Sequence, residues 1–196
     1  AYRGFIFRDI PNYFKRPRRE KEIIMASFSK ELRIPGWRLS YAIADPELVK
    51  AVETMEQAFN LCPNRLIQET LNIAFERDEY LSGVKKYIEN GRRHYARIAR
   101  LAYRLFRRKM PGIKALRPQG GFYVFFNHQR YLESSKEFCS KLLKRWQVAL
   151  APGVDFGMEG WTRLSYAPLS MDREKLEEGI DRIANFVAEL GEEGHS

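Results

Sequence analysis

The sequence predicts an α/β protein in two parts that a long helix joins. Patterns typical of strands alternate with patterns typical of amphipathic helices, and no internal repeat is found. One helical pattern runs unbroken from about Asp78 to Met110, or roughly 50 Å at 1.5 Å per residue. Because such a helix is too long for one compact core, we expect it to cross between two domains. Pro111 and Gly112 end it.

The chain before the long helix contains two short apolar segments that are rich in strand-forming residues. Asp45 and Pro46 then provide an N-cap and a first-turn proline, so a helix should begin there. A second helix follows a short polar break. The predicted elements are strands at residues 22–28 and 37–44 and helices at residues 45–61 and 64–76.

After the long helix the apolar pattern changes from helical spacing to alternation. The segment IKALRPQGGFYVFFNH predicts two strands about a turn at Gly120 and Gly121. Alternate residues of the second strand share a face, with Phe122, Val124 and Phe126 on one side and Tyr123 and Phe125 on the other.

The remaining chain alternates helix and strand. Ser134, with Glu137 three residues later, is typical of a capping box that opens a helix to about Trp146. VALAPGVDFG and WTRLSYAP predict a strand, a Gly-rich turn and a second strand. An amphipathic helix from about Met171 to Leu190 closes the chain.

Composition favours a folded globular protein. The chain has 196 residues, of which 44% are apolar and 13% aromatic, enough to fill a core. No run of eighteen apolar residues and no signal-peptide pattern occurs, so we expect no membrane partner and a cytoplasmic location. Cys62 and Cys139 are expected to be reduced thiols. His94, His128 and His195 have no metal-ligand spacing, so no metal site is expected.

The net charge of +9 comes mostly from residues 91–109, which contain no acidic residue. An apolar stripe at steps of three and four runs along the same helix, and its arginines occupy the remaining surface. We interpret the arginines as a solvated helix face and expect no nucleic-acid partner, with a nucleic-acid-binding patch as the alternative. The stripe consists of Leu81, Val84, Ile88, Gly91, Tyr95, Ile98, Ala102 and Leu105.

The stretch SFSKELRIPGWRLS, residues 27–40, combines the residue types of a covalent catalyst and of a phosphate site. A lysine that attacks a carbonyl needs a fixed, sheltered position. A phosphate needs hydroxyls, backbone N–H groups and a guanidinium fork. Lys30 lies between Ser27 and Arg38, and Gly36 allows close approach of the backbone. The alternative is a surface loop whose Lys30 and Arg38 are only solvated.

SFSK followed by GWR resembles the cofactor-lysine signature of the fold-type I pyridoxal-phosphate enzymes, in the class I/II aminotransferase family that includes aspartate aminotransferase. Similarity to that family's C-terminal half covers essentially the whole chain. The resemblance therefore implies the C-terminal portion of the large PLP-binding domain at residues 1–80, and the interdomain helix with a small α/β domain at residues 81–196. The landmarks, in family order, are Tyr2, SFSK, GWR, PQGGFYVFF, APGVDFG and WTRLSYA.

The resemblance also implies roles for single residues. Lys30 would form the Schiff base with pyridoxal 5'-phosphate and move the proton between substrate and cofactor. Ser27 and Arg38 would hold the phosphate, and Tyr2 would bind the phenolic oxygen of the ring. Arg163 would bind the substrate α-carboxylate through two parallel hydrogen bonds. The alternative for Arg163 is a structural ion pair with an acid such as Asp155.

The chain departs from the family pattern in two ways. Arg33 and Ser40 replace smaller residues of the signature, which affects loop packing but not the chemistry. The aspartate that the family places at the pyridine nitrogen, three residues before the tyrosine, would precede Ala1. We therefore expect the N-terminal half of the same protein as a partner of this chain, and little activity from the chain alone.

The function that this resemblance implies is a PLP-dependent transaminase, which exchanges an amino group between an amino acid and a 2-oxo acid. A PLP-dependent carbon-sulfur β-lyase on the same scaffold is the nearest alternative, and a basic nucleic-acid-binding module is the alternative from another class. The family implies a homodimer. The arginine of its dicarboxylate-specific branch falls near residues 60–65, where Asn60 is the nearest match, but Arg65 keeps that specificity open.

Overall fold

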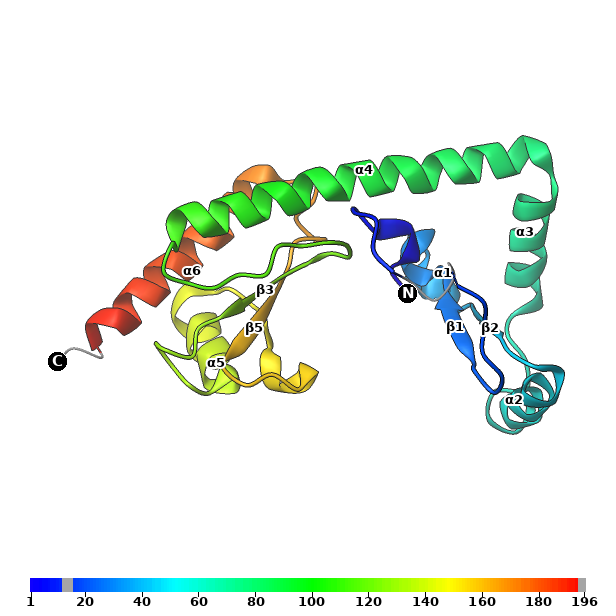
Figure 1. The fold of residues 1–196 in the computed structure, drawn as a ribbon. Helices are drawn as coiled ribbons and strands as arrows, with labels where there is room; N and C mark the ends of the chain where they lie inside the picture. The colour runs from blue at the N-terminus through cyan, green and yellow to red at the C-terminus, as the bar shows by residue number, and fades with distance from the viewer. Residues whose placement is uncertain (12–15, 194–196) are drawn as a thin grey trace. The chain divides into compact units, whose positions relative to one another are not determined.

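A computed structural model of the chain describes residues 1–11 and 16–193 (Figure 1). Helices and strands alternate along it, so the predicted α/β class is confirmed. The chain divides into two compact units, Ala1–Arg93 and His94–Ser196. The division falls inside the long helix α4 (Asp78–Lys109), whose predicted bounds were correct to one residue.

The first unit contains a two-stranded antiparallel sheet. Strand β1 (Ile24–Ser27) pairs with β2 (Ser40–Ile43), and Ser27 lies opposite Ser40. The short helix α1 (Phe28–Glu31) and the 3₁₀ turn η3 (Pro35–Trp37) connect them. The second strand begins three residues later than predicted because Trp37 belongs to the turn that Pro35 opens.

Two helices, α2 (Pro46–Phe59) and α3 (Arg65–Glu76), follow within two residues of their predicted bounds. Asn64 caps α3, since its side-chain oxygen accepts a hydrogen bond from Ile67 N at 3.3 Å. Asp45 holds the N-cap position of α2 but does not cap it. Its carboxylate instead pairs with Arg18 and accepts a hydrogen bond from Lys21 N at 3.1 Å, because two outside donors, one of them charged, compete with the helix for it.

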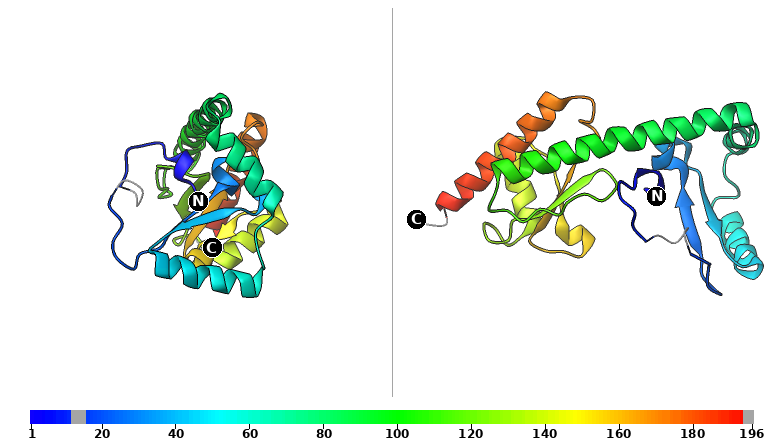
Figure 2. Two further views of the ribbon diagram at one scale, coloured as in Figure 1. Left: turned by 90° about the vertical axis from the view of Figure 1, so that its right-hand side faces the viewer. Right: turned by 45° about the horizontal axis from the view of Figure 1, so that its top comes forward.

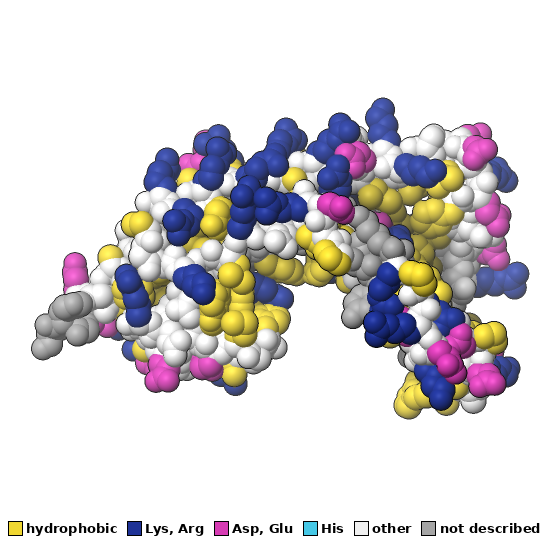
Figure 3. All heavy atoms as spheres, in the orientation of Figure 1, with side chains coloured by type: hydrophobic (Ala, Val, Ile, Leu, Met, Phe, Trp, Pro, Cys, Tyr) yellow, Lys and Arg dark blue, Asp and Glu magenta, His cyan; other side chains and the backbone are white. Residues whose placement is uncertain are grey.

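Helix α4 carries the predicted apolar stripe. Gly91, Ala102 and Leu105 are buried and the other stripe residues are half-buried. Lys and Arg side chains gather along the opposite surface, as Figure 3 shows. The exposed arginines of this surface are Arg93, Arg97, Arg100, Arg104, Arg107 and Arg108.

The second unit is built on a three-stranded antiparallel sheet in the order β3-β5-β4. The strands are β3 (Tyr123–Asn127), β4 (Ala151–Pro152) and β5 (Trp161–Ser165). Helices α5 (Ser135–Trp146) and α6 (Arg173–Glu193) belong to this unit, and α6 lies beside the end of α4, where Lys109 pairs with Asp181 (Figure 2). A chain of aromatic contacts joins α4, β3, α5 and α6 in the core, through Phe106, Phe126, Phe138 and Phe186.

The strand predictions for the second unit were partly wrong. The first arm of the predicted hairpin at Gly120 is not a regular strand and meets β3 through an isolated bridge from Ala115 to Phe126. Pro118 interrupts that arm, because proline cannot donate to a ladder. The strand before the Gly-rich turn has two residues, since η4 (Gly153–Phe156) begins directly after Pro152. The alternation along β3 was correct, and Phe122, Val124 and Phe126 are buried.

Both cysteines are free thiols, Cys62 exposed and Cys139 buried. None of the helices in residues 1–11 and 16–193 is long and apolar enough to cross a membrane.

Candidate active site

The Lys30 turn, residues 27–38, follows directly from strand β1. Ser27 ends the strand and caps α1, with its hydroxyl oxygen accepting a hydrogen bond from Ser29 N at 3.2 Å. Lys30 is the third residue of this four-residue helix and is half-buried. Within the described residues its amine has no hydrogen-bond or ion-pair partner. The turn therefore presents an amine that is partly sheltered and not engaged elsewhere.

Arg38 returns the chain to the same end of the sheet. It adopts a left-handed backbone conformation, with φ 51° and ψ 43°, two residues before Ser40, the register partner of Ser27. One guanidinium nitrogen donates to Pro35 O at 2.9 Å, and the side chain is exposed. The remaining N–H groups of Arg38 are available to a ligand at the end of the sheet that also holds Ser27.

Tyr2 is tied to the Lys30 turn through its neighbour. It precedes the 3₁₀ turn η1 (Arg3–Phe5), and its carbonyl oxygen accepts a hydrogen bond from Phe5 N at 2.9 Å. Arg3 pairs with Glu31, with Nη2 and Oε2 at 2.8 Å, and the Glu31 side chain is only 11% exposed. Since Tyr2 precedes Arg3 and Lys30 precedes Glu31, this ion pair holds the two predicted site residues on adjoining segments.

Arg33, the large residue that departs from the family pattern, anchors the loop to α4. Its guanidinium carbon lies 3.5 Å from the centre of the Tyr87 ring, and Nη2 donates to Tyr87 O at 2.8 Å. Gly91 makes room for it, because a Cβ at residue 91 would lie 2.2 Å from Nη1 of Arg33. The loop that follows Lys30 is therefore fixed at a second point.

Arg163 lies on the half-buried face of the other sheet. It is opposite Phe125 of β3 and Ala151 of β4. Its guanidinium carbon lies 4.2 Å from the centre of the Tyr123 ring and 4.0 Å from that of Phe156. No acid among the described residues pairs with it, so the alternative of an ion pair with Asp155 is not observed there. The two rings hold the guanidinium while its N–H groups stay available.

The structure brings some predicted site residues together and not others. Tyr2, Ser27, Lys30 and Arg38 all belong to the first unit, near α1 and the sheet end. Arg163 belongs to the second unit, as do the two rings that it contacts. Among residues 1–11 and 16–193, no group of three or more His, Cys, Asp or Glu is placed to hold a metal ion.

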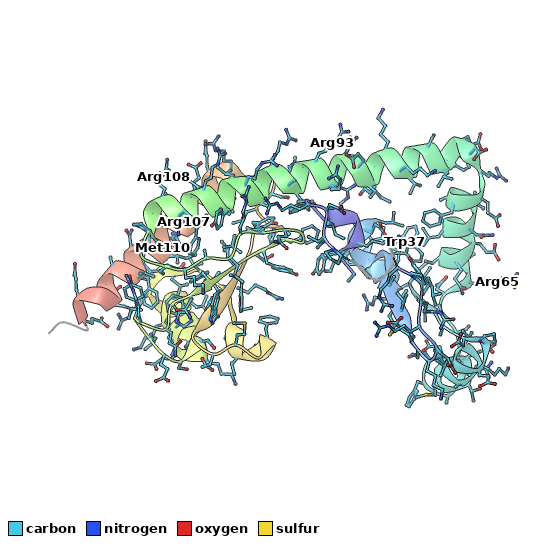
Figure 4. All side chains as sticks on the ribbon, in the orientation of Figure 1. Trp37, Arg65, Arg93, Arg107, Arg108 and Met110 are labelled. Carbon is cyan, nitrogen blue, oxygen red and sulfur yellow. The ribbon has the colours of Figure 1, made fainter. Side chains whose placement is uncertain are left out.

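Asn60 and Arg65, the two residues nearest in sequence to the family's dicarboxylate-binding arginine, lie on the surface. Asn60 ends α2 and donates to Glu56 Oε1 at 3.1 Å. Arg65 begins α3, as Figure 4 shows, with 88% of its side chain exposed, 3.7 Å from Glu69.

Sequence reasoning missed the residues that support the site, because they act through contacts distant in sequence. Arg3 and Glu31 carried one weak signal, as each directly follows a candidate site residue. Arg33 stands out in the sequence only as a departure from the family signature. Nothing in the sequence indicated that Tyr123 and Phe156 would meet at Arg163.

Comparisons with known proteins agree with one another. A family model described as aminotransferase class I and II matches residues 1–183. Aromatic-amino-acid aminotransferase 2 of Thermococcus litoralis is 33% identical over 195 residues, which cover 96% of this chain and 48% of that protein. Aspartate aminotransferase of Pyrococcus abyssi is 32% identical over 194 residues, with the same coverage of each chain, 96% and 48%.

A solved structure gives the same result for the fold. The aromatic aminotransferase from Pyrococcus horikoshii superimposes with a TM-score of 0.84 at 28% identity. The match covers 96% of this chain and 50% of that chain. The chain thus spans about half the length of the curated relatives it matches.

Proposed function

The chain belongs to the aminotransferase class I and II family, and from this premise we propose that it carries the lysine and both anion-binding arginines of a pyridoxal-phosphate-dependent transaminase. The reaction moves an amino group between an amino acid and a 2-oxo acid. The observation that carries the proposal is the unengaged amine of Lys30, on the turn that leaves the β1-β2 sheet at Ser27 and returns to it just after Arg38. Because the relatives are about twice as long, the proposal concerns the protein that contains this chain.

The residues of the Lys30 turn fit the cofactor. Arg38 has guanidinium N–H groups left for a phosphate, and the Ser27 hydroxyl can donate its proton to a phosphate oxygen. Tyr2, on the segment that Arg3 ties to Glu31, would donate its phenol proton to the ring oxygen. When bound, the cofactor supplies an electron-withdrawing ring that stabilises negative charge at the substrate α-carbon.

Lys30 would act as the covalent anchor and as the base. Its Nζ would take the proton from the substrate α-carbon and pass it to C4′ of the cofactor, and would move a proton in the opposite direction in the second half of the transfer. The contacts of Arg33 with Tyr87 restrict the loop that follows Lys30, which would keep the Nζ of Lys30 at a fixed position.

Arg163 would orient the substrate. Its planar guanidinium matches a carboxylate through two parallel N–H···O bonds, and the rings of Tyr123 and Phe156 hold its plane. A substrate held this way presents its α-carbon in one orientation. Asn60 and Arg65 both lie on the surface, so the structure favours neither as a residue that binds the substrate side chain.

The domain assignment, assembly and location are part of the proposal. Residues 1–80 would belong to the large cofactor-binding domain, and residues 81–196 to the interdomain helix and the small domain, with α4 shared between the two compact units as support. A homodimer would cover exposed apolar side chains such as Phe59 and Met25. The two free thiols suit a reducing cytoplasm.

Borohydride reduction of the cofactor-loaded protein that contains this chain, followed by peptide mapping, tests the assignment. We expect the cofactor on Lys30, and a label on another lysine would contradict it. Lys30→Ala should abolish turnover, whereas Lys50→Ala, an exposed lysine of α2 paired with Glu53, should leave it unchanged.

A second measurement separates the transaminase from the β-lyase alternative. A 2-oxo acid added to the amine form of the cofactor on the protein should regenerate the aldehyde form, which is followed by its absorbance. Failure to regenerate it, with elimination from a β-substituted amino acid, would favour the lyase.

A further inference from the structure

A small cavity in the second unit is lined by three arginines that the proposed function does not use. Its volume is about 270 Å³. Arg100 and Arg104 lie one helical turn apart on α4. Arg117 comes from the segment before β3, next to Leu116, whose N–H donates to Phe125 O at 2.8 Å. The lining, among residues 1–11 and 16–193, consists of Ala99, Arg100, Tyr103, Arg104, Arg117 and Pro118.

No described carboxylate neutralises these three cations. Arg100, Arg104 and Arg117 make no ion pair or hydrogen bond within residues 1–11 and 16–193. The sequence explains why, since it has no acidic residue between Glu89 and Glu133. Other arginines of α4 do find acids, as Arg92 and Arg93 do with Glu89. Like charges that converge without a counter-charge repel one another, and a bound anion relieves that repulsion.

The size and lining of the cavity favour a small anion over a polymer. About 270 Å³ is near the lower limit of the roughly 300–1,000 Å³ of ordinary ligand pockets. Tyr103 is the single aromatic residue of the lining, so a run of stacked bases has no platform there. Ala99, Tyr103 and Pro118 add an apolar wall, against which a short organic group can lie.

We propose that this cavity binds a small polyanion that carries phosphate groups. Guanidinium forks suit phosphate oxygens, and three of them match the charge of a diphosphate better than that of a single carboxylate. The lining shares no residue with the Lys30 turn or with the contacts of Arg163. The proposal is independent of the transaminase assignment.

Isothermal titration of the cofactor-loaded protein that contains this chain, with inorganic pyrophosphate as the probe, tests the site. Arg104→Gln and Arg117→Gln should each weaken binding about tenfold or more, since each removes a charged hydrogen-bond donor. Arg107→Gln and Arg108→Gln are matched controls, labelled in Figure 4 at the C-terminal end of the same helix, exposed and outside the lining. They should change Kd less than about twofold. Arg38→Gln should also leave pyrophosphate binding unchanged.

Five results would overturn the proposal. Equal losses in the pocket and control variants would mean general attraction to the basic helix, and an oligonucleotide that binds more tightly than pyrophosphate would favour a nucleic-acid surface. Citrate binding as tightly as pyrophosphate would remove the preference for phosphate. Pyrophosphate binding that is lost in Arg38→Gln but kept in Arg117→Gln would assign the probe to the Lys30 turn, which leaves the transaminase proposal intact. Absence of pyrophosphate binding would also refute the site.

Discussion

The guanidinium carbon of Arg163 lies 4.2 Å from the centre of the Tyr123 ring, across neighbouring strands of the same sheet. A second ring, that of Phe156, is centred 4.0 Å from the same carbon. The arginine is thus held by π-electron density and not by a carboxylate, and its hydrogen-bond donors remain for a ligand.

Removing either ring should weaken substrate binding through Arg163. We expect Tyr123→Leu and Phe156→Leu to raise KM for the amino acid and the oxo acid by about 2- to 10-fold, because cation–π contacts contribute about 0.5–1 kcal/mol when exposed and more when desolvated. Cofactor content should not change. Steady-state kinetics on both substrates measures this, with Tyr80→Leu, an exposed α4 residue, as the control. An unchanged KM in both variants would show that the rings do not position Arg163.

Arg38 and Arg163 should fail in different ways when replaced. Arg38→Ala should weaken cofactor retention about tenfold or more, since a charged donor to the phosphate is lost. Arg163→Ala should keep the cofactor and raise KM by a similar factor, and Arg163→Lys should recover little, because an ammonium lacks the two-pronged geometry. Absorbance after dialysis and initial rates test both expectations. Equal cofactor loss in the two alanine variants would mean that the roles are wrongly assigned.

The Tyr166 hydroxyl should contribute measurably to stability. Tyr166 is fully buried, and its hydroxyl donates to Gly121 O at 2.9 Å. Tyr166→Phe leaves that carbonyl unsatisfied, so we expect a loss of about 1–2 kcal/mol in the free energy of unfolding. Tyr80→Phe, at an exposed position, should change it by less than about 0.5 kcal/mol. Urea unfolding measures both, and equal effects would contradict the assignment.

Acid should destabilise the second unit through His128. The side chain is fully buried and stacks on Phe138 at 4.0 Å, and burial lowers its pKa. The unfolded chain therefore binds a proton near pH 6.5 that the folded chain does not, so stability is full above that pH and falls as pH drops below it. The slope should be at most about 1.4 kcal/mol per pH unit.

His128→Leu should remove that slope, although the variant is less stable overall because the hydrogen bond from Nδ1 to Leu132 O is lost. Glu159 affects stability over a different pH range. A hydrogen bond from the Ser135 backbone N–H lowers the pKa of its carboxyl, so its contribution to the free energy of unfolding is lost only below about pH 4.5. Urea unfolding from pH 8 to pH 5 tests this. A variant that keeps the wild-type slope would exclude His128 as its source.

Residues 1–196 by themselves should self-associate through α2. None of this helix is buried, and Met55 and Phe59, one turn apart, are 59% and 79% exposed. Replacing both with Glu should shift the chain toward monomer in size-exclusion chromatography with light scattering. Thr54→Glu, on the same helix at a polar position, is the control. A monomeric wild-type chain, or equal effects of the two replacements, would contradict this expectation.

Local patterns predicted most of the elements, and distant contacts explain the failures. The periodicity of α4 and the caps at Asn64 and Ser134 depend on neighbours within one turn, so the sequence contains them. The carboxylate of Asp45 was lost to Arg18, 27 residues away, a competition that no local pattern records. The site divides in the same way: the Lys30 turn is one continuous segment, whereas the contacts of Arg163 come from two other elements.

The close approach of Arg33 to Gly91 couples the effects of substitutions at two positions 58 residues apart in sequence. Any side chain at residue 91 displaces the guanidinium, whose Nη1 would lie 2.2 Å from the new Cβ. Because that nitrogen is the far end of a flexible side chain, Gly91→Ala alone should cost only the contacts of Arg33 with Tyr87, whereas with a small residue at 33 it should bring only a gain in helix propensity. The two substitutions are therefore non-additive, and the effect of filling residue 91 depends on the side chain that residue 33 carries at that time.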